Sequence, residues 1–241
     1  EADLYASYNL AFRAPSEGQL FRASSATSAT LAQLAARSAL GLKPVKVNQY
    51  EIGLRGKAGG FDCQLAAYRI DKTDDILSYK DPVTNATQSV NAGQTRHQGV
   101  EAGLGFALAK ALRLDSALSY AKHSYEEWRV AATTDYSGKE MEAAPRLIAN
   151  TRLTWQPAPA GRVQLEWLRL GSYWMDQANT AKYDGHDLFN LRGSWNLNKQ
   201  WALYGSVQNL ADERFAESAS VSSWRACERL ASPVRASCSA A

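Results

Sequence analysis

The sequence predicts an all-β fold, a transmembrane antiparallel β-barrel, from three observations. Apolar and polar residues alternate over eight to ten positions in one segment after another, which is the period of a strand with one apolar and one polar face. Short and long connections alternate along the chain. Tryptophan and tyrosine gather near the segment ends, where their amphipathic rings suit a lipid–water interface.

Nine segments carry the strand period. In one of them, Tyr50, Ile52 and Leu54 alternate with Glu51 and Arg55. Several segments are long enough to cross a membrane, because a tilted strand needs about 9–11 residues for that. The best competing helical pattern covers 29–42, inside a long connection. The expected strands are 2–12, 46–57, 61–79, 95–109, 112–127, 145–156, 162–174, 186–198 and 200–210.

The connections differ in length in a regular way. Short ones lie at 57–60, 110–111, 156–162 and 198–200, and long ones at 14–44, 80–95, 126–144 and 174–185. Outer-membrane barrels have this arrangement, with short periplasmic turns and long external loops. A soluble β-sandwich also has alternating strands, but its loops need not sort by length. The barrel is therefore favoured over the sandwich.

Seven aromatic residues are expected to form girdles at the two membrane interfaces, because an amphipathic ring is best placed there. The alternative is that they form the core of a soluble β-sandwich. These residues are Tyr120, Trp128, Trp155, Tyr173, Trp174, Trp201 and Tyr204.

Composition excludes several classes of protein. The 241 residues carry 27 basic and 24 acidic side chains, too balanced a charge to imply a nucleic-acid partner. The chain has no run of 18 apolar residues that could form a membrane-spanning helix. Three cysteines form neither a disulfide framework nor a zinc site. Because the sequence starts with Glu-Ala-Asp and no methionine, we expect a piece of a longer protein.

Four phrases, taken together and in this order, resemble those of TonB-dependent outer-membrane receptors. They are FRAPSEGQLF, LKPVKVNQYEIGLRG, NAGQTRHQGVEAGL and VQNLADERFAES. The resemblance covers residues 1 to about 219. The residues that carry it are Phe12, Arg13, Ala14, Pro15, Pro44, Tyr50, Glu51, Gly53, Asn91, Gly93, Gly99, Glu101, Asn209, Leu210 and Asp212.

This resemblance implies a partial barrel. Such receptors have 22 strands around an N-terminal plug, so the chain would supply about nine of the 22 strands, with the plug domain absent. Residues 1–216 would be the C-terminal part of the barrel. Residues 217–241 would be an aberrant or truncated tail in place of the last strand. A shifted reading frame is favoured for this tail over a loop closed by a Cys227–Cys238 disulfide.

The resemblance also implies the function: energised uptake of a ferric chelate (a siderophore) or a similar scarce nutrient across the bacterial outer membrane. The implied partners are outer-membrane lipid, the chelate or nutrient, and the inner-membrane TonB complex, reached through the missing plug. No catalytic motif occurs, so we expect no enzyme, no cofactor and no metal site. His97, His123 and His186 lack metal-ligand spacing, and haem is disfavoured because no histidine lies between Pro15 and Lys43.

Other classes of protein stay open at this point. One is a passive porin-like channel or an adhesin-type barrel, which would lack a plug. Another is a receptor for a non-iron substrate such as cobalamin or an oligosaccharide. A third is a soluble β-rich binding domain.

Aromatic and cationic residues near the external loops are the candidates for chelate binding, because charge and cation–π contacts suit anionic or catecholate ferric chelates. For each residue the alternative is packing in a loop or in an interface girdle. The candidates are Tyr79, Arg96, Tyr125, Trp128, Arg129, Tyr136, Tyr173 and Trp174.

Overall fold

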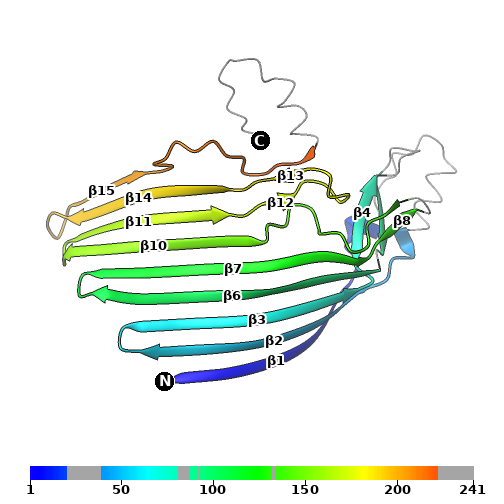
Figure 1. Cartoon of the computed structure of the whole chain (residues 1–241), viewed down its shortest axis with the longest axis horizontal. Coiled ribbons are helices and arrows are strands. Elements are labelled where there is room, and N and C mark those ends of the chain that lie inside the picture. The colour runs from blue at the N-terminus through cyan, green and yellow to red at the C-terminus, as the bar shows by residue number, and fades with distance from the viewer. Residues whose placement is uncertain (21–38, 81–86, 92, 132–133, 222–241) are drawn as a thin grey trace, which may run out of the picture.

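The computed structural model describes residues 1–20, 39–80, 87–91, 93–131 and 134–221. Its main element is a nine-stranded antiparallel sheet in the order β1-β2-β3-β6-β7-β10-β11-β14-β15. Neighbouring strands of the sheet are also successive along the chain, hairpin after hairpin (Figure 1). Short turns lie at one end of the sheet and the long connections lie at the other. This confirms the predicted sorting of the connections by length.

The nine strands correspond to the nine predicted ones. Most boundaries agree within about two residues, and the largest differences lie at the loop ends. The strands are β1 (Ala2–Arg13), β2 (Val45–Ala58), β3 (Phe61–Thr73), β6 (Gln94–Ala109), β7 (Leu112–Glu127), β10 (Leu147–Ala158), β11 (Gly161–Leu170), β14 (His186–Asn196) and β15 (Ala202–Val207).

Three predicted strands are too long, and one of them, expected at 200–210, covers only Ala202–Val207. The strand expected at 61–79 ends at Thr73, because Asp74 has a φ of 57° and interrupts the extended chain. The strand expected at 162–174 ends at Leu170. Gly171 follows it, and a Cβ there would lie 2.9 Å from the Leu147 carbonyl oxygen.

The long connections contain small hairpins that the sequence did not predict. These are β4 (Ile76–Lys80) with β5 (Thr87–Asn91), β8 (Arg129–Ala131) with β9 (Thr134–Asp135), and β12 (Tyr173–Trp174) with β13 (Lys182–Tyr183). A short helix, α1 (Glu17–Leu20), follows β1. The helix expected at 29–42 lies mostly outside the described residues, as do Cys227 and Cys238 in the tail.

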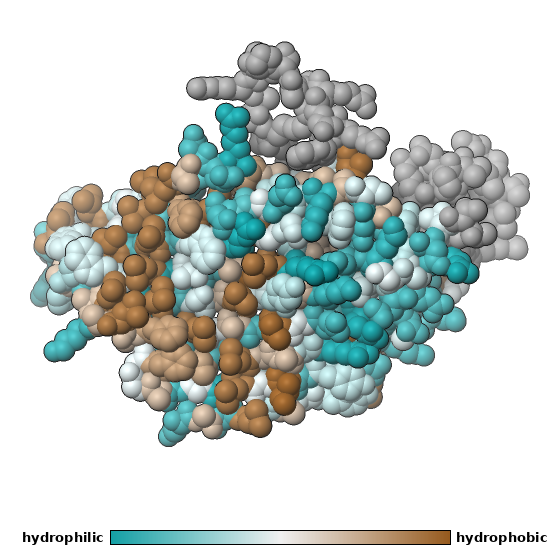
Figure 2. Space-filling view, in the orientation of Figure 1, coloured by the Kyte–Doolittle hydropathy of each residue, from teal (hydrophilic) through white to brown (hydrophobic). Residues whose placement is uncertain are grey.

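The sheet has two chemically different faces. On the apolar face, Leu4 pairs with Leu54, Leu54 with Leu65, and the row continues through Ala102 to Leu118. Several side chains of this face are widely exposed, among them Leu4, Tyr8, Leu10, Phe12, Val100, Trp155 and Leu203. Figure 2 shows apolar side chains gathered over the sheet and hydrophilic ones over the loop end.

The polar face carries hydrogen-bonded charges. Arg113 donates to Asp62 and to Asp115 at 2.8 Å each. Farther along the same face, the Glu166 carboxylate on β11 accepts hydrogen bonds from Asn150 on β10 and Asn190 on β14. Charged rows of this kind suit a hydrated surface. The alternation of apolar and polar residues in the sequence therefore corresponds to one apolar and one polar face of the sheet.

The motif residues have architectural roles. A Cβ on Gly53 would lie 2.3 Å from the Tyr5 ring. Glycine at this position therefore leaves room for the ring to lie across β2, where the Tyr5 hydroxyl donates to Glu51 at 2.9 Å. The side chain of Asn91 bonds both backbone groups of Lys43 and the carbonyl oxygen of Asp74. Asn91 therefore joins three segments at the loop end of the sheet.

The other motifs mark the ends of strands. Asn209 has a φ of 53° and closes a turn, because its side chain accepts from the Glu213 amide and donates to the Glu213 carbonyl oxygen. After Pro15, the Ser16 carbonyl oxygen accepts from the amides of Gln19 and Leu20 and begins α1. The first motif therefore marks the change from strand to loop.

Candidate functional site

The connection between β7 and β10 folds around a buried aromatic pair. Trp128 is 0% exposed and Tyr125 is 1% exposed, and Val90, Tyr136 and Met141 pack against them. The Tyr125 hydroxyl donates to Glu142 at 2.5 Å. This connection is therefore a packed unit with its own small core.

Polar contacts fix the rim of the same unit. Asp135 accepts hydrogen bonds from the Ser137 hydroxyl and amide and from Arg129. These bonds, those from Ser137 first, lower the pKa of Asp135 to about 2. Arg146 makes two hydrogen bonds to Glu140, which lower the pKa of that carboxyl.

The connection between β11 and β14 forms a second cluster. Tyr173, Met175 and Tyr183 are its buried members, and residues near the end of the described chain pack on them. The Tyr173 hydroxyl accepts from the Ala219 amide at 2.9 Å, and the Tyr183 hydroxyl accepts from the Ala216 amide at 3.2 Å. The described part of the tail therefore packs onto this loop.

Hydrogen bonds join the two loops into one surface, which we call the loop platform (residues 125–131, 134–146 and 171–185). Asn179 accepts from the Glu140 amide and donates to the Glu140 carbonyl oxygen, at 2.9 and 2.8 Å. Lys139 donates to the Ala178 carbonyl oxygen at 2.5 Å, and the Ala143 amide donates to Trp174 at 2.9 Å. These contacts hold the two loops together.

The structure separates the eight candidate binding residues into groups. Tyr125, Trp128 and Tyr173 are buried, so they serve as cores of the platform and lie away from the girdle expected for Trp128 and Tyr173. Because these three rings are buried among other protein atoms, they contact neither lipid nor a ligand directly. The expectation of an interface position fits Trp155 better, because it is 51% exposed on the apolar face.

Three candidates remain at the surface of the platform. Arg129 is exposed and paired with Asp135. Tyr136 is half-buried against the aromatic pair, and Trp174 is half-buried with the Lys182 ammonium 5.3 Å from its ring centroid. Tyr79 lies on β4, and its side chain falls outside the described part of the structure.

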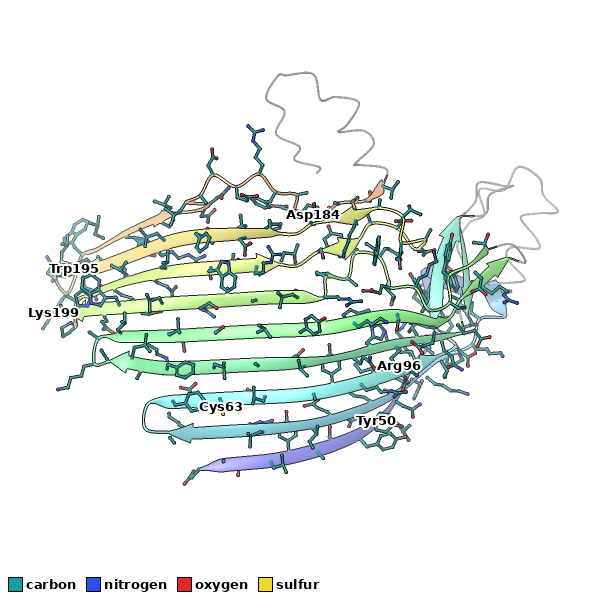
Figure 3. The ribbon with its side chains drawn as sticks, viewed as in Figure 1. Tyr50, Cys63, Arg96, Asp184, Trp195 and Lys199 are labelled. Atoms are coloured by element: carbon teal, nitrogen blue, oxygen red, sulfur yellow. The ribbon has the colours of Figure 1, made fainter. Side chains whose placement is uncertain are left out.

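Arg96 lies on β6 and contacts the edge of the platform through Glu126. It shares the face of β6 that carries Val100 and Leu104, and it donates to Asp71 at 2.7 Å and to Glu126 at 2.6 Å. Figure 3 shows Arg96 toward the loop end of the sheet. Its side chain therefore belongs to an ion-pair network beyond the apolar rows.

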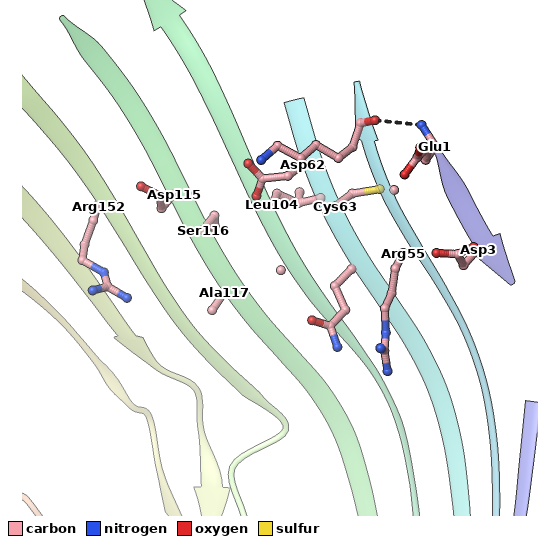
Figure 4. Close-up of a pocket in the computed structure, with 14 residues that line it drawn as sticks. Glu1, Asp3, Arg55, Asp62, Cys63, Leu104, Asp115, Ser116, Ala117 and Arg152 are labelled. Atoms are coloured by element: carbon pink, nitrogen blue, oxygen red, sulfur yellow. Dashed lines mark hydrogen bonds between the residues drawn. The ribbon is translucent and has the colours of Figure 1, made fainter. Parts of the chain in front are cut away.

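The polar face contains two hollows that sequence reasoning missed. One, of about 480 Å³, is lined by Arg55, Asp62, Asp115 and Arg152 from four strands (Figure 4). The other, of about 380 Å³, lies between Tyr68, His97 and His123, among other residues. Pairing of strands creates both hollows, so no single stretch of sequence shows them.

Across the described ranges no group of three or more His, Cys, Asp or Glu side chains could hold a metal ion. No helix in the same ranges is long and apolar enough to cross a membrane.

Comparison with known proteins gives a family match over most of the chain. The family described as "TonB dependent receptor-like, beta-barrel" matches residues 1–210. The ferrioxamine B receptor of Salmonella typhimurium is 27% identical over 188 residues, a match that covers 72% of this chain and 25% of the receptor. The probable TonB-dependent siderophore receptor PiuA of Acinetobacter baumannii is 24% identical over 183 residues, covering 72% of this chain and 24% of that protein.

Solved structures agree on the fold. The copper transporter OprC superposes with a TM-score of 0.70 at 21% identity, covering 90% of this chain and 32% of that one. The siderophore receptor PiuA from Acinetobacter baumannii gives a TM-score of 0.66 at 19% identity, with coverage of 88% and 30%. The chain spans about a quarter of the length of its curated relatives and has the fold of part of their barrel.

Proposed function

The chain belongs to the TonB-dependent receptor β-barrel family, and from this premise we propose that it forms the C-terminal part of a receptor barrel that takes up a ferric siderophore. The observation that carries the proposal is the family match over residues 1–210, together with curated relatives named as siderophore receptors. The match favours a receptor over the porin-like channel, the adhesin and the soluble domain.

The proposed location is the bacterial outer membrane. The rows of exposed leucine, valine and tyrosine on the apolar face support this, because outer-membrane barrels present such a band to lipid. The polar face would then line a hydrated lumen. Its charged hollow at Arg55, Asp62 and Arg152 suits a lumen filled by a polar plug domain.

We further propose that the platform surface contacts the chelate. Arg129, Tyr136 and Trp174 offer a cation and two aromatic rings, which suit an anionic or catecholate ferric chelate. Tyr79 belongs to the same proposal through its place on β4. Buried Tyr125, Trp128 and Tyr173 would act indirectly by holding the loops, whereas Arg96 faces away with the apolar rows.

Transport would be energised through the inner-membrane TonB complex, which in this proposal acts on a plug outside this chain. The barrel segment supplies the wall and part of the external binding surface. A non-iron nutrient stays an alternative, because selectivity would depend on the platform and on the plug.

Binding of ferric chelates to the full-length protein tests the proposal. A panel of radiolabelled ferric siderophores is titrated onto wild type, onto the double variant Y136A/W174A and onto W155A. W155A makes the same tryptophan-to-alanine change on the apolar face and serves as the control. We expect saturable binding of one chelate class by wild type and by W155A, with affinity weakened roughly tenfold or more in the double variant. Absence of binding to any chelate would contradict the proposed function, and equal binding by all three would contradict the platform assignment.

A further inference from the structure

We propose that His97 and His123 form a binding site for a divalent transition-metal ion of square-planar or octahedral preference, such as copper(II) or nickel(II), on the polar face of the sheet. The two Nδ1 atoms lie 2.7 Å apart. The proposal goes beyond chelate uptake, because it assigns metal binding to side chains of the barrel wall.

Strand pairing places both rings at one point. His97 on β6 and His123 on β7 are direct partners in the register, and their ring centroids are 5.0 Å apart. Directly opposite residues have Cβ atoms only about 4.5–5.5 Å apart on one face of the sheet. Two imidazoles on such positions can therefore reach the same ion without moving the backbone.

The two Nδ1 atoms of the pair contact each other. In contrast, Nδ1 of the third histidine, His186, contacts the Tyr183 hydroxyl at 2.8 Å. Of the three histidines, the cross-strand pair is the one that brings two ligand nitrogens together.

When a metal ion binds, the two neutral imidazoles of His97 and His123 keep the same total number of protons. Without metal, one Nδ1 carries a proton and donates it to the other, because each neutral imidazole has one N–H. Ligation by both Nδ1 atoms requires the donor ring to carry its proton on Nε2 instead. Each ring then offers one lone pair to the ion and keeps one proton.

The nitrogen spacing is close to that of two adjacent ligands on one ion. With metal–nitrogen bonds of about 2.05 Å, nitrogens 2.7 Å apart subtend about 80° at the metal. That angle is near the 90° of adjacent square-planar or octahedral positions and far from the roughly 109° of a tetrahedron. The pair therefore suits copper(II) and nickel(II), and copper(II) binds more strongly than zinc in the general affinity order.

The surroundings suit an exchangeable cation. Both histidines line the hollow of about 380 Å³, which also contains Glu51, Glu101 and Lys72. The hollow thus has two carboxylates against one ammonium, and the Lys72 ammonium acts on both imidazoles and favours their neutral, metal-ligating form. Since the described residues supply no third protein ligand, solvent in the hollow would fill the other positions, as at metal sites that keep open coordination.

Copper(II) titration of the full-length protein in detergent tests the site. Electron paramagnetic resonance should show superhyperfine coupling to two imidazole nitrogens, and zinc(II) should compete poorly. The double variant H97Q/H123Q should bind one fewer equivalent of copper(II), and each single variant should weaken that equivalent roughly tenfold or more. The control H186Q should keep it.

A second measurement uses the unaltered protein, in case the variants fail to assemble. Diethyl pyrocarbonate modifies histidines, and mass spectrometry identifies the sites. Copper(II) should protect His123 while leaving His186 as reactive as before. Equal modification of His123 with and without copper(II), or an unchanged copper(II) stoichiometry in the double variant, would overturn the proposal.

Discussion

Replacement of Trp128 by alanine should loosen the platform while leaving the sheet intact. Trp128 is 0% exposed and stacks on Tyr125 with ring centroids 6.0 Å apart, and Met141 also packs against this pair. Truncation of a fully buried tryptophan costs about 3–5 kcal/mol. Because this core belongs to the loop, the loss should appear as local opening of the platform.

Hydrogen exchange of the full-length protein measures that opening. A loss of about 3–5 kcal/mol corresponds to roughly hundred- to several-thousand-fold faster exchange in the protected amides. The Tyr136 and Gly138 amides are suitable reporters, because they donate to the carbonyl oxygens of Trp128 and Tyr125. The matched variant W155A, altered on the exposed apolar face, should leave these amides unchanged. Unaltered exchange of both amides in W128A would refute the view that the pair holds the loop.

Three further predictions concern the rim, the sheet and the isolated chain. The pKa of Asp135 is lowered to about 2, so the ionised carboxylate stabilises the rim of the platform fully above pH about 4, and this stabilisation is lost as pH falls toward 2. Hydrogen exchange at the Ser137 amide should become faster over that range. The same pH profile in D135N would contradict this prediction. G53A should lower the free energy of unfolding of the full-length protein in urea by about 1 kcal/mol, because the Tyr5 ring must move and lose its hydrogen bond to Glu51. An equal loss when G53A is made in the Y5A variant would exclude this cause. The 241-residue chain alone should aggregate in water and need detergent, because its nine-stranded sheet has two free edges and an exposed apolar face; a soluble, cooperatively folding monomer would refute that.

The strands of the main sheet could be predicted because their signal is local. The alternation of Tyr50, Ile52 and Leu54 with polar residues predicts both the strand and its apolar face from a few neighbouring residues. The small hairpins could not be read in this way, because β8–β9 and β12–β13 have strands of two or three residues, too short to show a period.

The candidate site was less predictable, because burial and pairing depend on distant parts of the chain. Tyr125 and Tyr136 look alike in the sequence, yet one is buried and the other lies partly open above it. The histidine pair shows the same limit. If the pairing of Ala109 with Leu112 at the tight turn continued without a break, His97 would lie opposite Ser124. A bulge between Ala107 and Ala109 shifts the register by one residue, so that His97 lies opposite His123. A one-residue irregularity therefore decides whether two imidazoles meet.

Accumulation of a radiolabelled ferric siderophore by intact cells tests the central claim most directly. Cells that carry the full-length gene are compared with cells that lack it, with and without TonB and with and without a protonophore. The account predicts saturable uptake that requires the gene, TonB and the proton-motive force. Uptake that rises linearly with concentration and continues without TonB would contradict it and indicate a passive channel.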